Sequence, residues 1–206
     1  MKTIINKFTK ATNVSVSKSI LLATLFSISF IACDKDDNPI APPVNEEELI
    51  TTVKAVFTPV GGGTPVTLTY KDLDGDGLGV AVVTDSEKFA QNKTYIGEVT
   101  FLNEAVYPVE DITEEIIEEA IDHQIFYQKT GSLPSFVYST DASNLDSNGK
   151  PIGLKVVFAT TTAATGELKI ILKHLPNKSA AGVSAGDMTN AGGSTDAEAT
   201  FNVVIQ

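Results

Sequence analysis

Three side chains that bind transition metals occur at positions that a folded chain can bring together. Glu119 and His123 are four residues apart at the end of a predicted helix, and His174 ends a predicted strand. Neutral imidazole and carboxylate are both ligands of Zn²⁺ and Cu²⁺. We expect a Zn²⁺ or Cu²⁺ site here if the helix lies across the strands. The alternative is a histidine that caps the helix C-terminus, where its charge suits the helix dipole, and a second histidine on a strand edge.

A second candidate site is the acidic segment Asp72-Leu73-Asp74-Gly75-Asp76-Gly77. Carboxylates at positions 1, 3 and 5 with glycine at position 6 are typical of the start of a calcium loop. The twelfth position, where such loops carry a bidentate glutamate, is Val83, so Asp85 or another loop would have to complete the shell. The other interpretation is a polar turn in which Asp and Gly adopt positive φ. The predicted Ca²⁺ ligands are Asp72, Asp74 and Asp76.

The segment Gly182-Val183-Ser184-Ala185-Gly186 matches the G-x-S-x-G motif of hydrolases. In that motif the serine lies between a strand and a helix, and the catalytic histidine follows it in the chain. The two histidines of this chain both precede Ser184. An Ala- and Gly-rich segment produces the same string without catalytic meaning. We therefore expect no catalytic residues, and we expect that the protein is not an enzyme.

The single cysteine, Cys33, follows a segment with the features of an export signal. Residues 1–19 contain four lysines and no acidic residue, and residues 20–31 are mostly apolar. This run is too short to cross a hydrocarbon core about 30 Å thick. Before the cysteine, Ala32 and Ile31 fit a lipoprotein cleavage site, whereas Phe30 stands where leucine is usual. We expect residues 1–32 to be removed and two or three acyl chains on Cys33 to anchor the protein to a membrane.

Residues 33–48 are acidic and proline-rich, and this composition predicts an extended tether. Asp34-Lys35-Asp36-Asp37 resembles the export signal that places lipoproteins on the outer face of the outer membrane in Bacteroidota. In enterobacteria an aspartate directly after the cysteine would favour retention at the inner membrane, but the Lys-Asp-Asp tract favours the first interpretation. The expected location is the cell surface.

The charge of the chain excludes one large class of partner. All 15 basic residues are lysines, there are 26 acidic residues, and cleavage before Cys33 would remove four lysines and no acid. The mature chain would then carry a net charge of −15. Proteins that bind nucleic acid neutralise phosphates with basic patches. We therefore expect no nucleic-acid partner.

Beyond the tether, apolar and polar residues alternate with a period of two, which is typical of half-buried strands. Turns are predicted at residues 146–149 and 164–166, and residues 175–196 form a long connection. Short strands without βα alternation predict an antiparallel, all-β, Ig-like β-sandwich over residues 49–206. The nine predicted strands comprise residues 50–58, 66–71, 78–84, 95–102, 124–129, 135–140, 154–160, 167–174 and 198–205.

One short acidic helix interrupts the strands between Pro108 and His123. Asp111 and Glu114 form the pair that caps a helix N-terminus. We expect this helix to cross between the sheets and cover an open end of the core. The apolar residues predicted on its inner face are Ile112, Ile116, Ile117, Ala120 and Ile121.

Over most of its length the chain resembles small flavobacterial lipoproteins of uncharacterised function. The resemblance rests on the Cys33 region and residues 71–77, 111–127 and 174–179. Such sequences are sometimes assigned a type 1 periplasmic binding fold, which has two α/β lobes, whereas the strand pattern predicts a sandwich. The resemblance implies an envelope lipoprotein working beside an outer-membrane receptor. We expect a non-enzymatic binding or accessory module, or alternatively a metal-binding surface lipoprotein.

Overall fold

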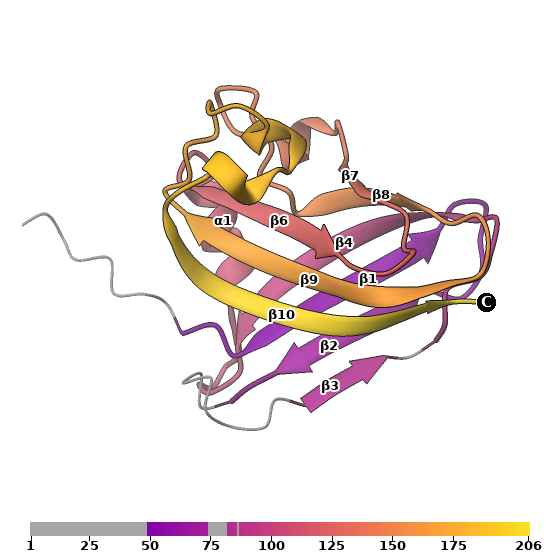
Figure 1. The fold of residues 1–206 in the computed structure, drawn as a ribbon. Coiled ribbons are helices and arrows are strands. Elements are labelled where there is room, and N and C mark those ends of the chain that lie inside the picture. Colours follow the sequence, from indigo (N-terminus) through magenta and orange to yellow (C-terminus); the bar gives the residue numbers. More distant parts are fainter. Residues whose placement is uncertain (1–48, 74–81, 86) are drawn as a thin grey trace, which may run out of the picture. The chain divides into compact units, whose positions relative to one another are not determined.

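The computed structural model describes residues 49–206 except 74–81 and 86. The chain divides into two units, residues 1–43 and 44–206, and the second contains every described residue. Its strands form two antiparallel sheets (Figure 1). The predicted all-β sandwich is confirmed.

The larger sheet has the strand order β3-β2-β1-β4-β8-β7, with β5 paired to β4. Its first hairpin joins β1 and β2 with Phe57 opposite Val66, as the alternating pattern predicts. Every strand pair in this sheet is antiparallel. The strands are β1 (Thr52–Pro59), β2 (Val66–Lys71), β3 (Val82–Asp85), β4 (Thr94–Asn103), β5 (Glu110–Asp111), β7 (Phe136–Tyr138) and β8 (Lys155–Ala159).

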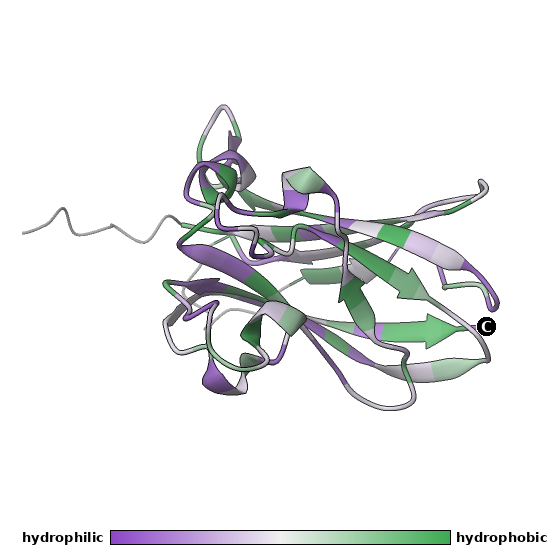
Figure 2. Cartoon of the chain, turned by 90° about the horizontal axis from the view of Figure 1, so that it is seen from above, coloured by the Kyte–Doolittle hydropathy of each residue, from purple (hydrophilic) through white to green (hydrophobic). Residues whose placement is uncertain are grey.

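The smaller sheet has the order β10-β9-β6, also antiparallel. It is formed by β6 (His123–Lys129), β9 (Ala164–His174) and β10 (Ser194–Ile205). Seen from above, the two sheets form two layers, and hydrophobic and hydrophilic residues alternate along the strands (Figure 2). The described strands include all nine predicted ones, at least in part, and the two-residue β5 in addition.

Aromatic side chains fill the centre of the core. Phe89 lies edge-on to Phe57 at 5.2 Å and to Phe158 at 5.1 Å between ring centroids, and Phe136 stacks on Phe158 at 4.3 Å. A Cβ on Gly97 of β4 would lie 2.5 Å from the Phe57 ring, so only glycine leaves room for it there. Such pairs add about 0.5–1.5 kcal/mol each beyond the area that they bury.

The helix α1 (Ile112–Glu118) carries the chain from β5 of the larger sheet to β6 of the smaller one. Asp111 is its N-cap, and its carboxylate accepts a hydrogen bond from the Thr113 amide. Ile112 and Ile116 point into the core, each 2 % exposed. The helix therefore crosses between the sheets, as predicted (Figure 1).

Two details of the sequence prediction are wrong. Ile117 and Ile121 are about half exposed, because the helix ends at Glu118 and only its first turns meet the core. Residues 164–166 are not a turn but the start of β9, paired with the end of β10. Gly166 is needed there because a Cβ would lie 2.2 Å from the carbonyl oxygen of Thr130. A glycine inside a strand can mark close backbone approach rather than a turn.

Candidate metal centre

His123 and His174 form a cross-strand pair at one end of the smaller sheet. The register of β6 and β9 places them directly opposite each other. Their rings stack with centroids 4.9 Å apart and planes 11° from parallel. Side chains two residues apart share a face of a strand, and Ile125 and Leu172 on this face belong to the main core. Both imidazoles therefore lie on the inner face, between the layers.

The turns next to the two histidines fix this pairing. The Leu175 amide donates to the Asp122 carbonyl at 2.6 Å, and Leu175 takes the left-handed conformation, with φ of 52°. A Cβ on Gly193 would lie 2.1 Å from the carbonyl oxygen of His174. Only glycine permits that approach at its φ of +67°. The chain leaves β9 and enters β10 around His174 with little freedom.

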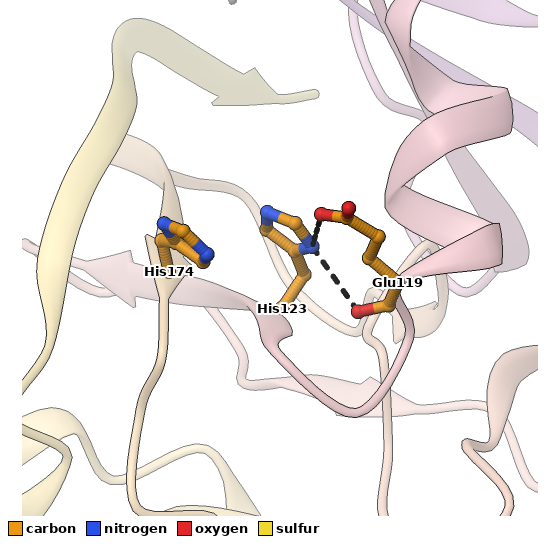
Figure 3. Close-up of side chains that lie close together, drawn as sticks. All are labelled: Glu119, His123 and His174. Carbon is orange, nitrogen blue, oxygen red and sulfur yellow. Dashed lines mark hydrogen bonds and ion pairs between the residues drawn. The ribbon is translucent and has the colours of Figure 1, made fainter. Parts of the chain in front are cut away.

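Glu119 completes the predicted trio from the C-terminal end of α1. One ligand atom from each of Glu119, His123 and His174 lies within 4.8 Å of the others (Figure 3). The Glu119 carbonyl oxygen lies 3.2 Å from Nδ1 of His123, and its carboxylate oxygen lies 3.9 Å from the same nitrogen. The structure thus brings the three residues together. It also contains part of the predicted alternative: His123 contacts the carbonyl at the helix end, whereas His174 lies on β9, the central strand of its sheet.

The environment of His123 favours the neutral ring. The residue is only 7 % exposed. Burial lowers its pKa below the ordinary value, and the neighbouring His174 lowers it further. The Glu119 carbonyl and the charges of Asp196 and Glu119 oppose this shift without reversing it. Metals bind the neutral imidazole, so burial keeps His123 in its ligand form.

The two imidazoles are close enough to share a metal but are not yet aimed at one point. Ring nitrogens direct their lone pairs in the ring plane, so the lone pairs of parallel rings run side by side. Two ligands of tetrahedral Zn²⁺ at about 2.0–2.1 Å lie about 3.4 Å apart. A metal bound by both His123 and His174 therefore requires one ring to rotate. The residues available to hold the ion are these two histidines and a nearby carboxylate.

The calcium prediction is only partly within the described residues. Asp72 follows β2, is half-buried, and donates its amide to the Thr51 carbonyl at 2.8 Å. It lines a cavity of about 150 Å³ together with Asp196 and Glu198 of β10. Asp74, Asp76 and Cys33, the predicted lipidation residue, lie outside the described residues.

Sequence reasoning missed Asp196. Its Oδ2 lies 3.8 Å from Nε2 of His123, and its side chain is 13 % exposed. The register of β10 against β9 shifts between Thr195 and Ala197, which makes Asp196 the extra residue of a β-bulge. A bulge is not visible in a period-two pattern. The weak signal in the sequence is the polar run Ser194-Thr195-Asp196 before an apolar strand.

Ser184 has a structural partner. Its hydroxyl donates to the Lys178 carbonyl at 2.6 Å. It lies in a short 3₁₀ turn, Val183–Ala185, bounded by Gly182 and Gly186, both with positive φ. Val183 within this turn is fully buried. The glycines of the G-x-S-x-G string thus shape a turn that inserts Val183 into a small cluster on the outer face of the smaller sheet.

No family model, curated protein or solved structure matches this chain. The resemblance to flavobacterial lipoproteins therefore stays a prediction. Among the described residues, no helix has the length and apolar character to cross a membrane.

Proposed function

We propose that this protein is a lipid-anchored envelope protein that acts as a non-enzymatic binding module, and that its ligand is a divalent transition metal. The observation that carries the proposal is the convergence of His123, His174 and a carboxylate at one end of the sandwich. Two of these residues belong to different elements, β6 and β9, and Glu119 belongs to the end of α1.

The donor set favours Zn²⁺ or Cu²⁺ over Ca²⁺. Two imidazoles with a carboxylate suit first-row metals of borderline softness, whereas Ca²⁺ takes six to eight oxygens. Within the first-row series, affinity generally rises to Cu²⁺ and falls again at Zn²⁺. The acidic mature chain also attracts cations over longer distances.

Metal titration tests the binding function. The mature chain, residues 33–206 with Cys33→Ser, is titrated calorimetrically with Zn²⁺, Cu²⁺ and Ca²⁺. We expect one Zn²⁺ or Cu²⁺ per chain and a rise in melting temperature with either, because a ligand that binds only the folded state stabilises it. The variant His174→Asn should lose at least tenfold in affinity.

The matched control is Glu118→Gln. It removes a charge next to Glu119 on α1, but Glu118 is not one of the three candidate ligands. It should bind like the parent protein. The absence of both heat and a melting shift with Zn²⁺ and Cu²⁺ would refute the metal function.

Cell fractionation tests the anchor. The full chain should fractionate with the membranes of a bacterium that processes lipoproteins, and Cys33→Ser should lose the lipid and the shorter mature form. Two or three acyl chains anchor a protein durably, whereas the acidic body gains nothing from anionic headgroups. Unchanged membrane association and processing of the Cys33→Ser variant would contradict lipidation.

A further inference from the structure

We propose that the outer edge of β7 is a docking site, at which an extended, uncharged peptide segment of a partner protein adds a strand to the larger sheet. The candidate metal ligands Glu119, His123 and His174 do not line the groove beside this edge, so the proposal does not depend on metal binding. Three features of the edge lead to it: the direction of its backbone groups, the groove along it and the charge of that groove.

The first feature is the hydrogen bonding of β7, which lies at one edge of the larger sheet (Figure 1). In the described part of the chain, β8 is its only neighbour in the sheet. The Ser139 amide, just after the strand, donates to the Lys155 carbonyl of β8 at 2.9 Å. In an antiparallel pair, alternate residues direct both backbone groups to the same neighbour. Val137 therefore also bonds to β8, whereas Phe136 and Tyr138 direct their N–H and C=O groups away from it.

These outward backbone groups have no hydrogen-bond partner among the described residues. The side chains of the same two residues are fixed, because Phe136 stacks on Phe158 and the Tyr138 hydroxyl donates to the Ile125 carbonyl at 2.5 Å. The core thus holds the strand in place while its backbone edge stays free. Such a row of N–H and C=O groups is a template for one more strand, and an extended peptide matches its spacing.

The second feature is a groove of about 560 Å³ beside β7. Residues 135–140 all line it. Successive side chains of a strand point to opposite faces, so a groove that meets all of these residues runs along the edge of the strand. Leu145 and Pro151 from one loop and Ala185 from another also line it. Because two loops flank the edge, a single extended chain fits there better than the edge of a second folded sandwich.

The third feature is the charge of the groove. None of the described residues that line it is charged, whereas the whole chain has a net charge of −11. An acidic segment would be repelled by the chain, and a charge buried in the groove would have no partner. Val137 is 60 % exposed and would gain an apolar neighbour on the added strand. The matching occupant is an uncharged segment in which small polar and apolar residues alternate.

Selection from a displayed library of random peptides of about eight residues supplies the probe, since a strand has about five or six residues. The target is the mature chain, residues 33–206 with Cys33→Ser, and the enriched peptides are synthesised for affinity measurements. We expect uncharged sequences with apolar residues at alternate positions. The variant Ala185→Trp places a large side chain in the groove and should weaken their binding at least tenfold.

The matched control is Ala181→Trp. Ala181 is an exposed alanine of the same connection as Ala185, but it does not line the groove. This variant should bind the peptides like the parent protein. Denaturation curves of both tryptophan variants establish that they are folded.

Two further measurements read the backbone pairing itself and need no variant. A peptide added as a strand uses alternate N–H groups, so N-methylation should weaken its binding about tenfold at every second position and much less in between. In hydrogen exchange, the amides of Phe136 and Tyr138 should exchange fast in the free protein and slowly in the complex. The Val137 amide already bonds to β8, so the peptide should change its exchange least.

Several results would overturn the proposal. These are the absence of any enriched peptide, equal binding to the parent and Ala185→Trp, uniform sensitivity to N-methylation, or unchanged exchange of Phe136 and Tyr138 in the complex. A concentration-dependent dimer that Ala185→Trp abolishes, without peptide binding, would overturn it in favour of a second copy of the chain. None of these results depends on Zn²⁺ or Cu²⁺, so the metal function is tested separately.

Discussion

Two buried polar clusters in this sandwich differ in how their hydrogen bonds are matched. In the first, the Lys178 ammonium lies 3.1 Å from the Asp146 carboxylate, and their side chains are 6 % and 1 % exposed. In the second, the His123 imidazole lies 3.8 Å from the Asp196 carboxylate, with exposures of 9 % and 13 %. Both clusters join segments that are distant in the sequence.

The Lys178 cluster pairs donors with acceptors. The ammonium also donates to the Ala120 carbonyl at 2.5 Å. The second carboxylate oxygen of Asp146 accepts from the amides of Asn148 and Lys150 at 2.8 and 2.9 Å. Burial raises the pKa of Asp146, but these hydrogen bonds outweigh it and hold the pKa below the ordinary value. Asp146 is therefore an anion held by its own loop.

The His123 cluster is more loosely paired, because Nε2 of His123 lies 3.8 Å from the Asp196 carboxylate, which is beyond hydrogen-bond distance. A buried network whose donors and acceptors are matched rigidifies a fold. The contrast assigns a structural role to Lys178 with Asp146, whereas the proposed metal-binding role belongs to the cluster around His123.

The same substitution should have effects of very different size in the two clusters. Asp146→Asn places an amide N–H₂ against the Lys178 ammonium and leaves a buried cation unpaired, which should cost about 3–5 kcal/mol of unfolding free energy. Asp196→Asn, in the presence of chelator, removes a charge that lies 3.8 Å from Nε2 of the neutral His123 ring and should change the unfolding free energy by less than about 1 kcal/mol. Urea denaturation of the metal-free mature chain measures both.

The control for this pair is Lys169→Met. It breaks the more exposed ion pair with Glu198 and should change stability by less than about 1 kcal/mol. A loss in Asp196→Asn as large as that in Asp146→Asn would remove the distinction between the clusters, because both aspartates would then be structural anions.

The sandwich was predictable because its strands alternate in the sequence. Val53, Ala55 and Phe57 point inward as the period requires, and the change of period at Ile112 and Ile116 identifies the helix. The prediction failed at Gly166, where glycine allows two backbone segments to approach closely and does not mark a turn. It also failed at the end of the helix, because the helix stops at Glu118 although apolar residues continue in the sequence. The spacing of apolar residues along the chain cannot predict these contacts, because they join residues that are distant in the sequence.

The candidate site was predictable in its two histidines and in Glu119, but not in the neighbouring Asp196. His123 and His174 are the only two histidines in the chain, and they ended a predicted helix and a predicted strand, respectively. Asp196 depends on a bulge, and the Asp146–Lys178 pair depends on two loops meeting. No spacing in the sequence encodes either. Chemistry-bearing residue types are visible in a sequence, but the side chain that faces them across a sheet is not.

The smallest effect that separates the clusters is a dependence of stability on pH. Glu119, His174 and Asp196 face His123, and burial lowers the pKa of His123 in the folded protein. In the unfolded chain it titrates near its ordinary value of about 6.5. Between the folded pKa and 6.5 the unfolded state binds more protons, so stability falls as the pH falls through this window.

Urea midpoints with chelator at pH 7.5 and 5.5 measure this dependence. One group contributes at most about 1.4 kcal/mol per pH unit. The variant His123→Gln keeps a donor for the Glu119 carbonyl and removes the titration, so its stability should fall less than that of the parent over this interval. Asp146 titrates below this interval, because hydrogen bonds lower its pKa from an already acidic value. If the parent and His123→Gln show the same pH dependence, the titration of His123 does not contribute to it, and the prediction is wrong.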